Sequence, residues 1–283
     1  MLQQTRVAVV KERYGNFLQR FPDVRSLARA PLSRVLAEWS GLGYYRRARN
    51  LHAAARMMTR RGGCIPRSAA ELRELPGIGR YTAAAISSIA FGEAQAAVDG
   101  NVERVVARLL GSEADPWQAT TFLLDRVRPG DFNQAMMELG ATVCLPRQPR
   151  CEVCPMARFC AHPKDRHLRK ARRCVAPERI KAKQAYVFSR HADKILLRRR
   201  PAAASLMPGM WELPRTRRKS GPVKLRLRHS ITNTDYMITV FLRARSGRAE
   251  QSGVWQPVST LHRLPLTGLT RKILRRLAPE TNL

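Results

Sequence analysis

Four cysteines within seventeen residues restrict what this chain can fold into. They follow the pattern Cys144-x6-Cys151-x2-Cys154-x5-Cys160. Thiolates at such short spacings hold either a tetrahedral zinc ion or an iron–sulfur cluster. Zinc ribbons usually carry two Cys-x2-Cys pairs, whereas here only the middle pair has that spacing. The wider outer gaps favour one compact loop wrapped around a larger object, so we expect a [4Fe–4S] cluster at these four positions, with zinc as the alternative.

The charge balance indicates a polyanionic partner. The 283 residues include 52 Lys and Arg against 21 Asp and Glu, which gives a formal net charge of +31. This excess is far larger than solubility requires and suits nucleic acid, although a general arginine bias of the source proteome would also raise it. The hydrophobic content of 44% excludes a disordered basic tail and allows two ordinary domains.

No apolar stretch is suited to a membrane or to export. No run reaches the roughly eighteen apolar residues of a membrane span. Charges at Arg6, Lys11 and Glu12 interrupt any signal-peptide core. We therefore expect a cytoplasmic protein that associates with the nucleoid through DNA and has no membrane partner. In that compartment, clustered cysteines indicate a metal site rather than disulfides.

Hydrophobic periodicity divides the chain into two domains. Residues 1–160 show only helical periods and are expected to be all-α, with the cysteine loop at 144–160. Residues 161–183 form a basic linker, which is a solvated spacer unless DNA lies beside it. Residues 184–283 change to strand periods and are expected to be α+β. The second domain is predicted to hold a hairpin over 184–198, strands over 236–242 and 253–258, and a helix over 269–277.

The expected helices of the first domain follow its turns and caps. Ser68 and Glu71 form a capping box, and Asp131 is expected to cap the last helix, in which Ala135, Met136, Leu139 and Val143 face inward. The predicted helices are one ending near Phe21-Pro22, then 32–39, 45–60, one starting after Ser68, 101–110, 116–127 and one starting after Asp131.

One further stretch combines a tight turn with a single acid. Gly77 and Gly79 stand two apart in Leu75-Pro-Gly-Ile-Gly79, directly before an apolar helix. Bare amides at a helix N-terminus bind phosphate, although an ordinary interhelical turn has the same composition. Asp99 follows in Val98-Asp-Gly-Asn101, where it is a candidate catalytic acid and also a suitable N-cap.

Together, the cysteine loop, the glycine turn and Asp99 resemble the endonuclease III superfamily of DNA glycosylases, which has a helix-hairpin-helix and an iron–sulfur loop. Three segments narrow the resemblance to the adenine DNA glycosylase (MutY-type) family: Met1-Leu-Gln-Gln-Thr5, Gly41-Leu-Gly-Tyr-Tyr45 and Phe132-Asn-Gln-Ala-Met-Met-Glu-Leu-Gly140. The resemblance is close up to about residue 160 and looser beyond it. It implies a monofunctional hydrolase of N-glycosyl bonds that removes adenine mispaired with 8-oxoguanine or guanine. Its partner would be double-stranded DNA with A:8-oxoG or A:G mispairs, and we expect a monomer.

The resemblance also implies roles for individual residues. Asp99 would stabilise the oxocarbenium-like sugar. Lyase members carry a lysine on the helix after the hairpin, where this chain has Tyr81, so a lyase that acts through a Schiff base is disfavoured. Gln4 and Tyr44 would enter the base stack as wedges, with hairpin packing as the alternative for Tyr44. The implied DNA-binding set is Gln4, Tyr44, Gly77, Gly79, Tyr81 and Asn101.

The second domain resembles the Nudix-like domain that reads 8-oxoguanine in this family. Leu206-Met-Pro-Gly-Met-Trp-Glu-Leu-Pro214 matches a characteristic segment, whereas the Nudix hydrolase box is missing. The resemblance therefore implies lesion binding without pyrophosphatase activity. The family's lesion-reading loop aligns with Ile231-Thr232-Asn233, which makes Thr232 and Asn233 candidate lesion-recognition residues, with a plain strand-end turn as the alternative.

One family residue has no counterpart in this sequence. The family's general acid is a glutamate two positions upstream of the Met that aligns with Met1. No other acid takes that place, since the first one is Glu12. Unprotonated adenine is a poor leaving group, so the missing acid matters for rate. We expect a start codon that was placed too late, and a catalytically inactive mismatch-binding protein is the alternative.

Overall fold

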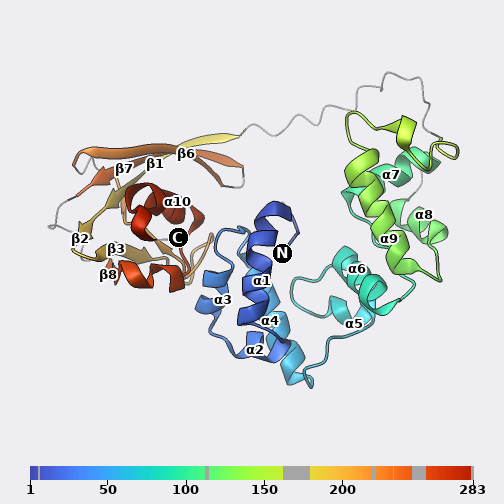
Figure 1. Ribbon diagram of the computed structural model, residues 1–283, viewed down its shortest axis with the longest axis horizontal. Helices are drawn as coiled ribbons and strands as arrows, with labels where there is room; N and C mark the ends of the chain where they lie inside the picture. The colour runs from blue at the N-terminus through green and yellow to red at the C-terminus, as the bar shows by residue number, and fades with distance from the viewer. Residues whose placement is uncertain are drawn as a thin grey trace. The chain divides into compact units, whose positions relative to one another are not determined.

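The computed structural model describes residues 1–5, 7–111, 115–161, 179–217, 221–231, 233–243 and 253–281. It divides into two compact units (Figure 1), one of Met1–Gly63 with Val175–Leu283 and one of Cys64–Cys174. This division differs from the expected single domain over residues 1–160, because the first 63 residues pack against the C-terminal part. None of the described helices is both long and apolar enough to cross a membrane.

Four helices make up the N-terminal part of the first unit. The helix predicted to end near Phe21-Pro22 does so, because proline cannot continue it. Asp23 then starts the next helix, since its carboxylate accepts the Ser26 amide at 2.6 Å. Phe17 makes edge-on contacts with Phe21 and Trp39 in a shared core. The helices are α1 (Val7–Arg20), α2 (Val24–Arg29), α3 (Leu32–Glu38) and α4 (Arg46–Arg60).

The C-terminal part contains two sheets. The first has the strand order β5-β1-β7-β6, and the second has β2-β3-β4 with β8 also paired to β3. The strands are β1 (Ile180–Phe188), β2 (Arg190–His191), β3 (Lys194–Arg199), β4 (Trp211–Glu212), β5 (Arg215–Thr216), β6 (Val223–Ile231), β7 (Thr234–Leu242) and β8 (Val254–Pro257), and the helix is α10 (Gly268–Leu277).

The hairpin predicted over residues 184–198 is confirmed only near its turn, where Arg190 and His191 pair with Ile195 and Lys194. β1 pairs in parallel with β7 and antiparallel with β5, whereas only the two-residue strand β2 forms a hairpin with β3. β1 also begins at Ile180, inside the expected linker, most of which lies outside the described residues. Alternating residues identify a strand but do not identify its partner, since parallel pairing joins segments far apart in sequence.

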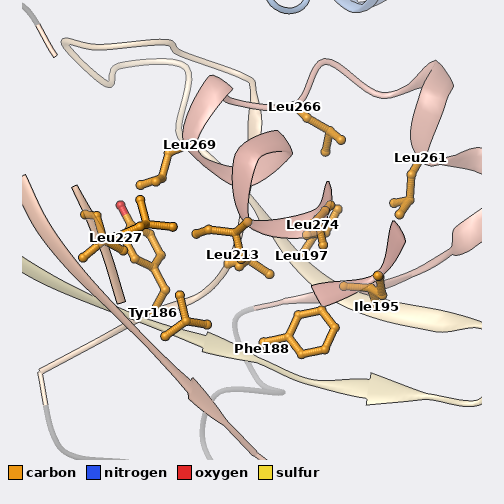
Figure 2. Packing of buried hydrophobic residues seen from close by; sticks show 14 residues of the cluster. Tyr186, Phe188, Ile195, Leu197, Leu213, Leu227, Leu261, Leu266, Leu269 and Leu274 are labelled. Carbon is orange, nitrogen blue, oxygen red and sulfur yellow. The ribbon is translucent and has the colours of Figure 1, made fainter. Parts of the chain in front are cut away.

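Figure 2 shows the core that joins these two sheets to α10. Fully buried side chains come from β3 (Ile195, Leu197), from β7 (Ile238, Val240) and from α10 (Ile273, Leu274). Each sheet has an apolar face that must be covered. The helix α10 packs against these faces and supplies the second layer that a stable domain needs. The predicted α+β composition of this part is therefore correct.

Polar contacts join the N-terminal helices to the C-terminal part. The hydroxyls of Ser40 and Tyr45 both donate to the carbonyl of Leu266, at 3.3 and 3.4 Å. Arg271 of α10 donates to the Ser40 carbonyl at 3.2 Å. Burial, with the nearby Arg13 charge, lowers the pKa of Arg271 to about 10. These contacts explain why the first 63 residues form one unit with the C-terminal part.

The second unit is all-helical over its described residues, as predicted. The helices are α5 (Ala69–Arg73), α6 (Arg80–Phe91), α7 (Gly100–Leu110), α8 (Pro116–Leu123) and α9 (Pro129–Glu138), which continues into the π-helical turn η1 (Leu139–Val143). The Ser68–Glu71 capping box is confirmed. Asp131 does not cap α9, which begins two residues earlier, and pairs instead with Arg128 at 2.7 Å. Ala135 is exposed, whereas Pro129, Asn133 and Met136 are the buried residues of this helix.

Asn133 is the polar centre of this unit. Its Oδ1 accepts the Ala97 amide at 2.9 Å, and its Nδ2 donates to the Ser88 hydroxyl and the Gln95 carbonyl at 2.9 and 2.8 Å. The side chain is fully buried, so each of these bonds replaces one that water cannot supply. Asn133 thereby ties α9 to α6 and to the extended segment that leads into Asp99.

We predict that Asn133→Ala destabilises the protein by about 3 kcal/mol, because it removes the partner of the buried Ala97 amide and of the buried Ser88 hydroxyl. Gln134→Ala is the matched control, since Gln134 is the exposed neighbour on the same helix and should change stability by less than about 0.5 kcal/mol. Urea unfolding followed by circular dichroism measures both. Equal midpoints for the two variants would contradict the assignment.

Candidate active site and cysteine loop

The glycine turn has the geometry that its sequence predicts. Gly77 has a φ of 81°, a left-handed conformation that favours glycine. The Ile78 amide donates to the Leu75 carbonyl at 3.2 Å and closes the turn. Gly79 is the N-cap of α6 and offers no side-chain acceptor to the first amides of the helix. The start of α6 therefore carries the positive end of the helix dipole with no capping side chain at Gly79, which favours an external anion there.

Asp99 is the N-cap of α7, as one of its two predicted roles requires. Its Oδ1 accepts the backbone amides of Asn101 and Val102, at 2.9 and 2.8 Å. Its Oδ2 accepts the side-chain amide of Asn101 at 3.0 Å. Three donors and the positive end of the α7 dipole thus fix a carboxylate in one orientation. A capping carboxylate keeps its negative charge, so Asp99 can also stabilise a positive charge that develops beside it.

Tyr81 lies within electrostatic range of Asp99. It is half-buried near the start of α6, and its hydroxyl donates to the Met137 sulfur at 3.5 Å. Burial and the negative charge of Asp99 raise the pKa of Tyr81, so the phenol is neutral at physiological pH. The site therefore pairs a fixed carboxylate with a neutral hydroxyl, and Tyr81 brings no amine to it.

Arg104 connects Asp99 to the cysteine loop. Its Nη2 donates to the side-chain oxygen of Asn101 at 3.0 Å, and its Nε donates to the Cys144 carbonyl at 3.0 Å. Nη2 also reaches the Gly140 carbonyl at 2.6 Å. A Cβ on Gly140 would lie 2.8 Å from the Cβ of Asn101, so glycine is what lets the turn η1 approach α7 so closely.

The four predicted cysteine ligands converge on one pocket. Cys144, Cys151, Cys154 and Cys160 line it together with Arg108 and apolar groups from Val143, Pro149 and Ala157. Burial, the neighbouring cysteines and Glu152 raise the pKa of the Cys151 thiol. Within the described ranges, no three His, Cys, Asp or Glu side chains are grouped closely enough to hold a single metal ion.

Arg108 fastens both ends of this loop. Its Nη1 lies 3.2 Å from the Cys144 sulfur and donates to the Leu145 carbonyl at 2.8 Å. The Cys160 thiol donates to the Arg108 carbonyl at 3.3 Å. Four soft donors, an apolar lining and one cation beside the sulfurs are the chemistry expected around an anionic metal–sulfur group.

The residues expected to enter the base stack belong to the other unit. Gln4 and Tyr44 are both exposed, and both are non-glycine residues with positive φ, 55° and 46°. Tyr44 is 59% exposed, so it does not pack in the core, whereas Tyr45 beside it is buried. The predicted site residues thus lie in both compact units.

The predicted lesion-reading loop is described only in part. Thr232 lies outside the described residues, and Asn233 is exposed in the turn between β6 and β7. The Leu206–Pro214 segment packs against the N-terminal helices, because Met210 is fully buried in their core and Arg49 donates to the Pro208 carbonyl. This segment therefore joins the N-terminal helices to the C-terminal part of the same unit.

Sequence reasoning missed Arg104, Arg108 and Asn133. A signal existed for the two arginines, since Asn101, Arg104 and Arg108 recur at helical spacing and share one side of α7. Their partners are backbone carbonyls of the loop near Cys144, however, and no residue pattern specifies which carbonyls will meet a guanidinium.

Several known proteins are similar to this chain. Residues 1–129 match the HhH-GPD superfamily of base excision DNA repair proteins. An adenine DNA glycosylase of Homo sapiens is 50% identical over 171 residues, which cover 56% of this chain and 31% of the human protein. An adenine DNA glycosylase of Arabidopsis thaliana is 36% identical over 260 residues, which cover 76% of this chain and 41% of the plant protein. The chain thus spans less than half the length of these relatives.

Two solved structures share the helical fold. A thermostable thymine-DNA glycosylase is 31% identical with a TM-score of 0.54, and the match covers 57% of this chain and 79% of that one. An endonuclease III solved in a non-covalent complex with DNA is 27% identical with a TM-score of 0.50, over 56% and 77% of the two chains. The glycine turn and the capped Asp99 both lie within residues 1–129, and this part of the chain belongs to the HhH-GPD superfamily of base excision DNA repair proteins.

Proposed function

We propose that this protein is a monofunctional DNA glycosylase that removes adenine mispaired with 8-oxoguanine or guanine. The observation that carries the proposal is Asp99, a carboxylate held by three hydrogen bonds beside Tyr81, where a lyase needs an amine. The human and plant relatives named adenine DNA glycosylase support this substrate. The formal charge of +31 supports duplex DNA as the partner.

Phosphate binding and the stabilisation of positive charge on the sugar each have residues suited to them. The free amides at Gly77 and Gly79 bind a DNA phosphate beside the start of α6. When the N-glycosidic bond breaks, positive charge develops on the sugar, and the Asp99 carboxylate stabilises it electrostatically or as a transient covalent partner. Water then adds to the sugar carbon. Asn101 keeps the carboxylate aimed, since its side chain bonds Oδ2.

Tyr81 limits the reaction to base removal. A lyase attacks the sugar with an amine and then breaks the DNA strand through a Schiff base. A phenol cannot form that adduct, and the raised pKa of Tyr81 keeps the hydroxyl protonated. The product is therefore an abasic site in an intact strand. The adenine itself must be protonated to leave, a step that the family assigns to a glutamate upstream of the position that aligns with Met1.

The other predicted residues serve recognition. Gln4 and Tyr44 enter the base stack when the adenine is flipped out. The C-terminal part, residues 184–283, acts as a Nudix-like domain that reads the opposite base through Thr232 and Asn233. It carries no Nudix hydrolase box, so it binds and does not hydrolyse. Residues 1–160 carry the helix-hairpin-helix glycosylase function, and the basic linker that follows them ends before β1 begins at Ile180.

Cys144, Cys151, Cys154 and Cys160 hold a [4Fe–4S] cluster in this proposal. Four thiols around one apolar pocket, with Arg108 beside Cys144, suit such a group. These four thiols would hold the cluster, and this attachment would restrain the loop between Cys144 and Cys160. Because the Cys144 carbonyl accepts from Arg104, a rigid loop also fixes the side chain that bonds Asn101.

We predict that Asp99→Asn lowers the single-turnover rate of adenine release by at least about 100-fold, since it removes the charge that the transition state needs. The asparagine oxygen can still accept the two α7 amides, so the fold should persist. Asp115→Asn is the matched control, because Asp115 caps α8 by accepting the Gln118 amide at 2.8 Å. The measurement uses an A:8-oxoG duplex followed by alkaline strand cleavage.

Three results would overturn the proposed function or redirect it. Binding of the mispaired duplex with no product indicates a catalytically inactive mismatch-binding protein. Strand nicking without alkali indicates a lyase. Equal rate losses for Asp99→Asn and Asp115→Asn show that the loss comes from helix capping rather than from charge beside the sugar.

The cysteine loop gives a separate prediction. The purified protein should contain about four iron atoms per chain and absorb visible light, as a [4Fe–4S] cluster requires. Cys151→Ala should lose most of this iron, whereas Cys64→Ala should keep it, because Cys64 is exposed and lies far outside the loop in sequence. Bound zinc without visible absorbance would contradict the cluster.

A further inference from the structure

We propose that Arg47 is a positioning residue that holds Gln4 and Tyr44 together as one rigid probe of the DNA base stack. This inference rests on the proposed function, which gives Gln4 and Tyr44 their role in the stack. Arg47 is the second residue of α4, directly after the Gly41–Tyr45 loop. It contacts both segments that carry the two exposed tips.

The first segment bound by Arg47 is Met1–Thr5. Its Nη1 donates to the carbonyls of Met1, at 2.6 Å, and Gln3. Its Nη2 donates to the Thr5 hydroxyl at 2.8 Å. Gln4 thus lies between two residues that are both bonded to one guanidinium, which fixes the backbone on either side of it.

The second segment is the loop around Tyr44. Nη2 of Arg47 also donates to the carbonyls of Leu42 and Gly43, at 3.3 and 3.4 Å. The guanidinium carbon lies 5.3 Å from the centre of the Tyr44 ring and 5.5 Å from that of Trp39. The Thr5 hydroxyl donates to the Leu42 carbonyl at 3.3 Å, so the two segments also contact each other directly.

The backbone at both tips needs such a constraint. Gln4 and Tyr44 have φ values of 55° and 46°, a conformation that side-chain-bearing residues adopt only where their surroundings impose it. Neither side chain is buried, so packing around the tips does not supply the constraint. Arg47 supplies it through the Gln3 carbonyl before Gln4, the Thr5 hydroxyl after Gln4, and the carbonyls before Tyr44.

This bonding distinguishes Arg47 from an arginine that binds DNA phosphate. Both terminal nitrogens of Arg47 are engaged inside the protein, and the side chain is only partly exposed. A planar fork with five donors can reach several carbonyls at once, whereas a lysine ammonium cannot span them. Probes that are ordered before binding lose less entropy when they enter the stack, so this order raises discrimination rather than general DNA affinity.

The test compares two substitutions that conserve charge, Arg47→Lys and Arg46→Lys. Arg46 is the exposed neighbour on the same helix turn and is the matched control. The probe is a duplex with one A:8-oxoG pair and 2-aminopurine beside the adenine, whose fluorescence rises on unstacking. A fully paired duplex measures general affinity. Each full-length variant is titrated with both duplexes.

We expect Arg47→Lys to reduce both the fluorescence rise and the preference for the mispaired duplex, the latter about tenfold, equivalent to about 1.4 kcal/mol. Affinity for the fully paired duplex should stay unchanged. Arg46→Lys should keep the fluorescence rise. Wild-type behaviour in Arg47→Lys overturns the inference, as does an equal loss in both variants, which indicates phosphate binding. If the wild-type protein shows neither preference nor fluorescence rise, the proposed function itself fails.

Hydrogen exchange keeps the test valid if Arg47→Lys is less stable. A positioning role predicts faster amide exchange confined to residues 1–5 and 41–45, with unchanged protection of α6 and α7. Uniformly faster exchange shows a general folding defect and overturns the positioning role.

Discussion

The candidate site depends on the hydrogen bonds that the Arg104 side chain makes. One guanidinium bonds Asn101, which in turn bonds the Asp99 carboxylate, and the same guanidinium bonds the carbonyl of Cys144. A catalytic carboxylate needs a fixed direction, and an N-cap aspartate alone could still rotate about its χ angles. Asn101 removes that freedom only while its own side chain is held. The orientation of Asp99 therefore rests on where the cysteine loop places a backbone carbonyl.

The local parts of this structure follow from the sequence. Capping residues and helical periods predict the first residues of α4, α5, α6 and α7 to within one or two positions, and Asp99 is the cap that the sequence predicts. The turn at Gly77 was predicted because only glycine adopts its φ at no cost. These features depend on residues a few positions apart, so short-range rules describe them fully.

The remaining features depend on partners that are distant in sequence. β1 pairs with β7, about fifty residues later, and an alternating pattern does not contain that choice. Likewise, Ser40 and Tyr45 meet Leu266, so the N-terminal helices share a unit with the C-terminal sheets rather than with α6 and α7. The roles of Arg47 and Arg104 were not predictable for the same reason, because their acceptors are backbone carbonyls of remote segments.

The internal arginines change how the net charge should be understood. A charge of +31 predicts a polyanionic partner only if the cations face solvent. Arg47, Arg104, Arg108 and Arg271 instead donate to backbone carbonyls within their own units. Burial lowers the pKa of Arg47 and of Arg271, as expected for cations withdrawn from water. Part of the basic composition therefore organises the loops that carry the proposed site, and only the remainder is available to DNA phosphates. In this chain the guanidinium group serves both to hold loops in place and to bind phosphate, and the net charge does not distinguish these two uses.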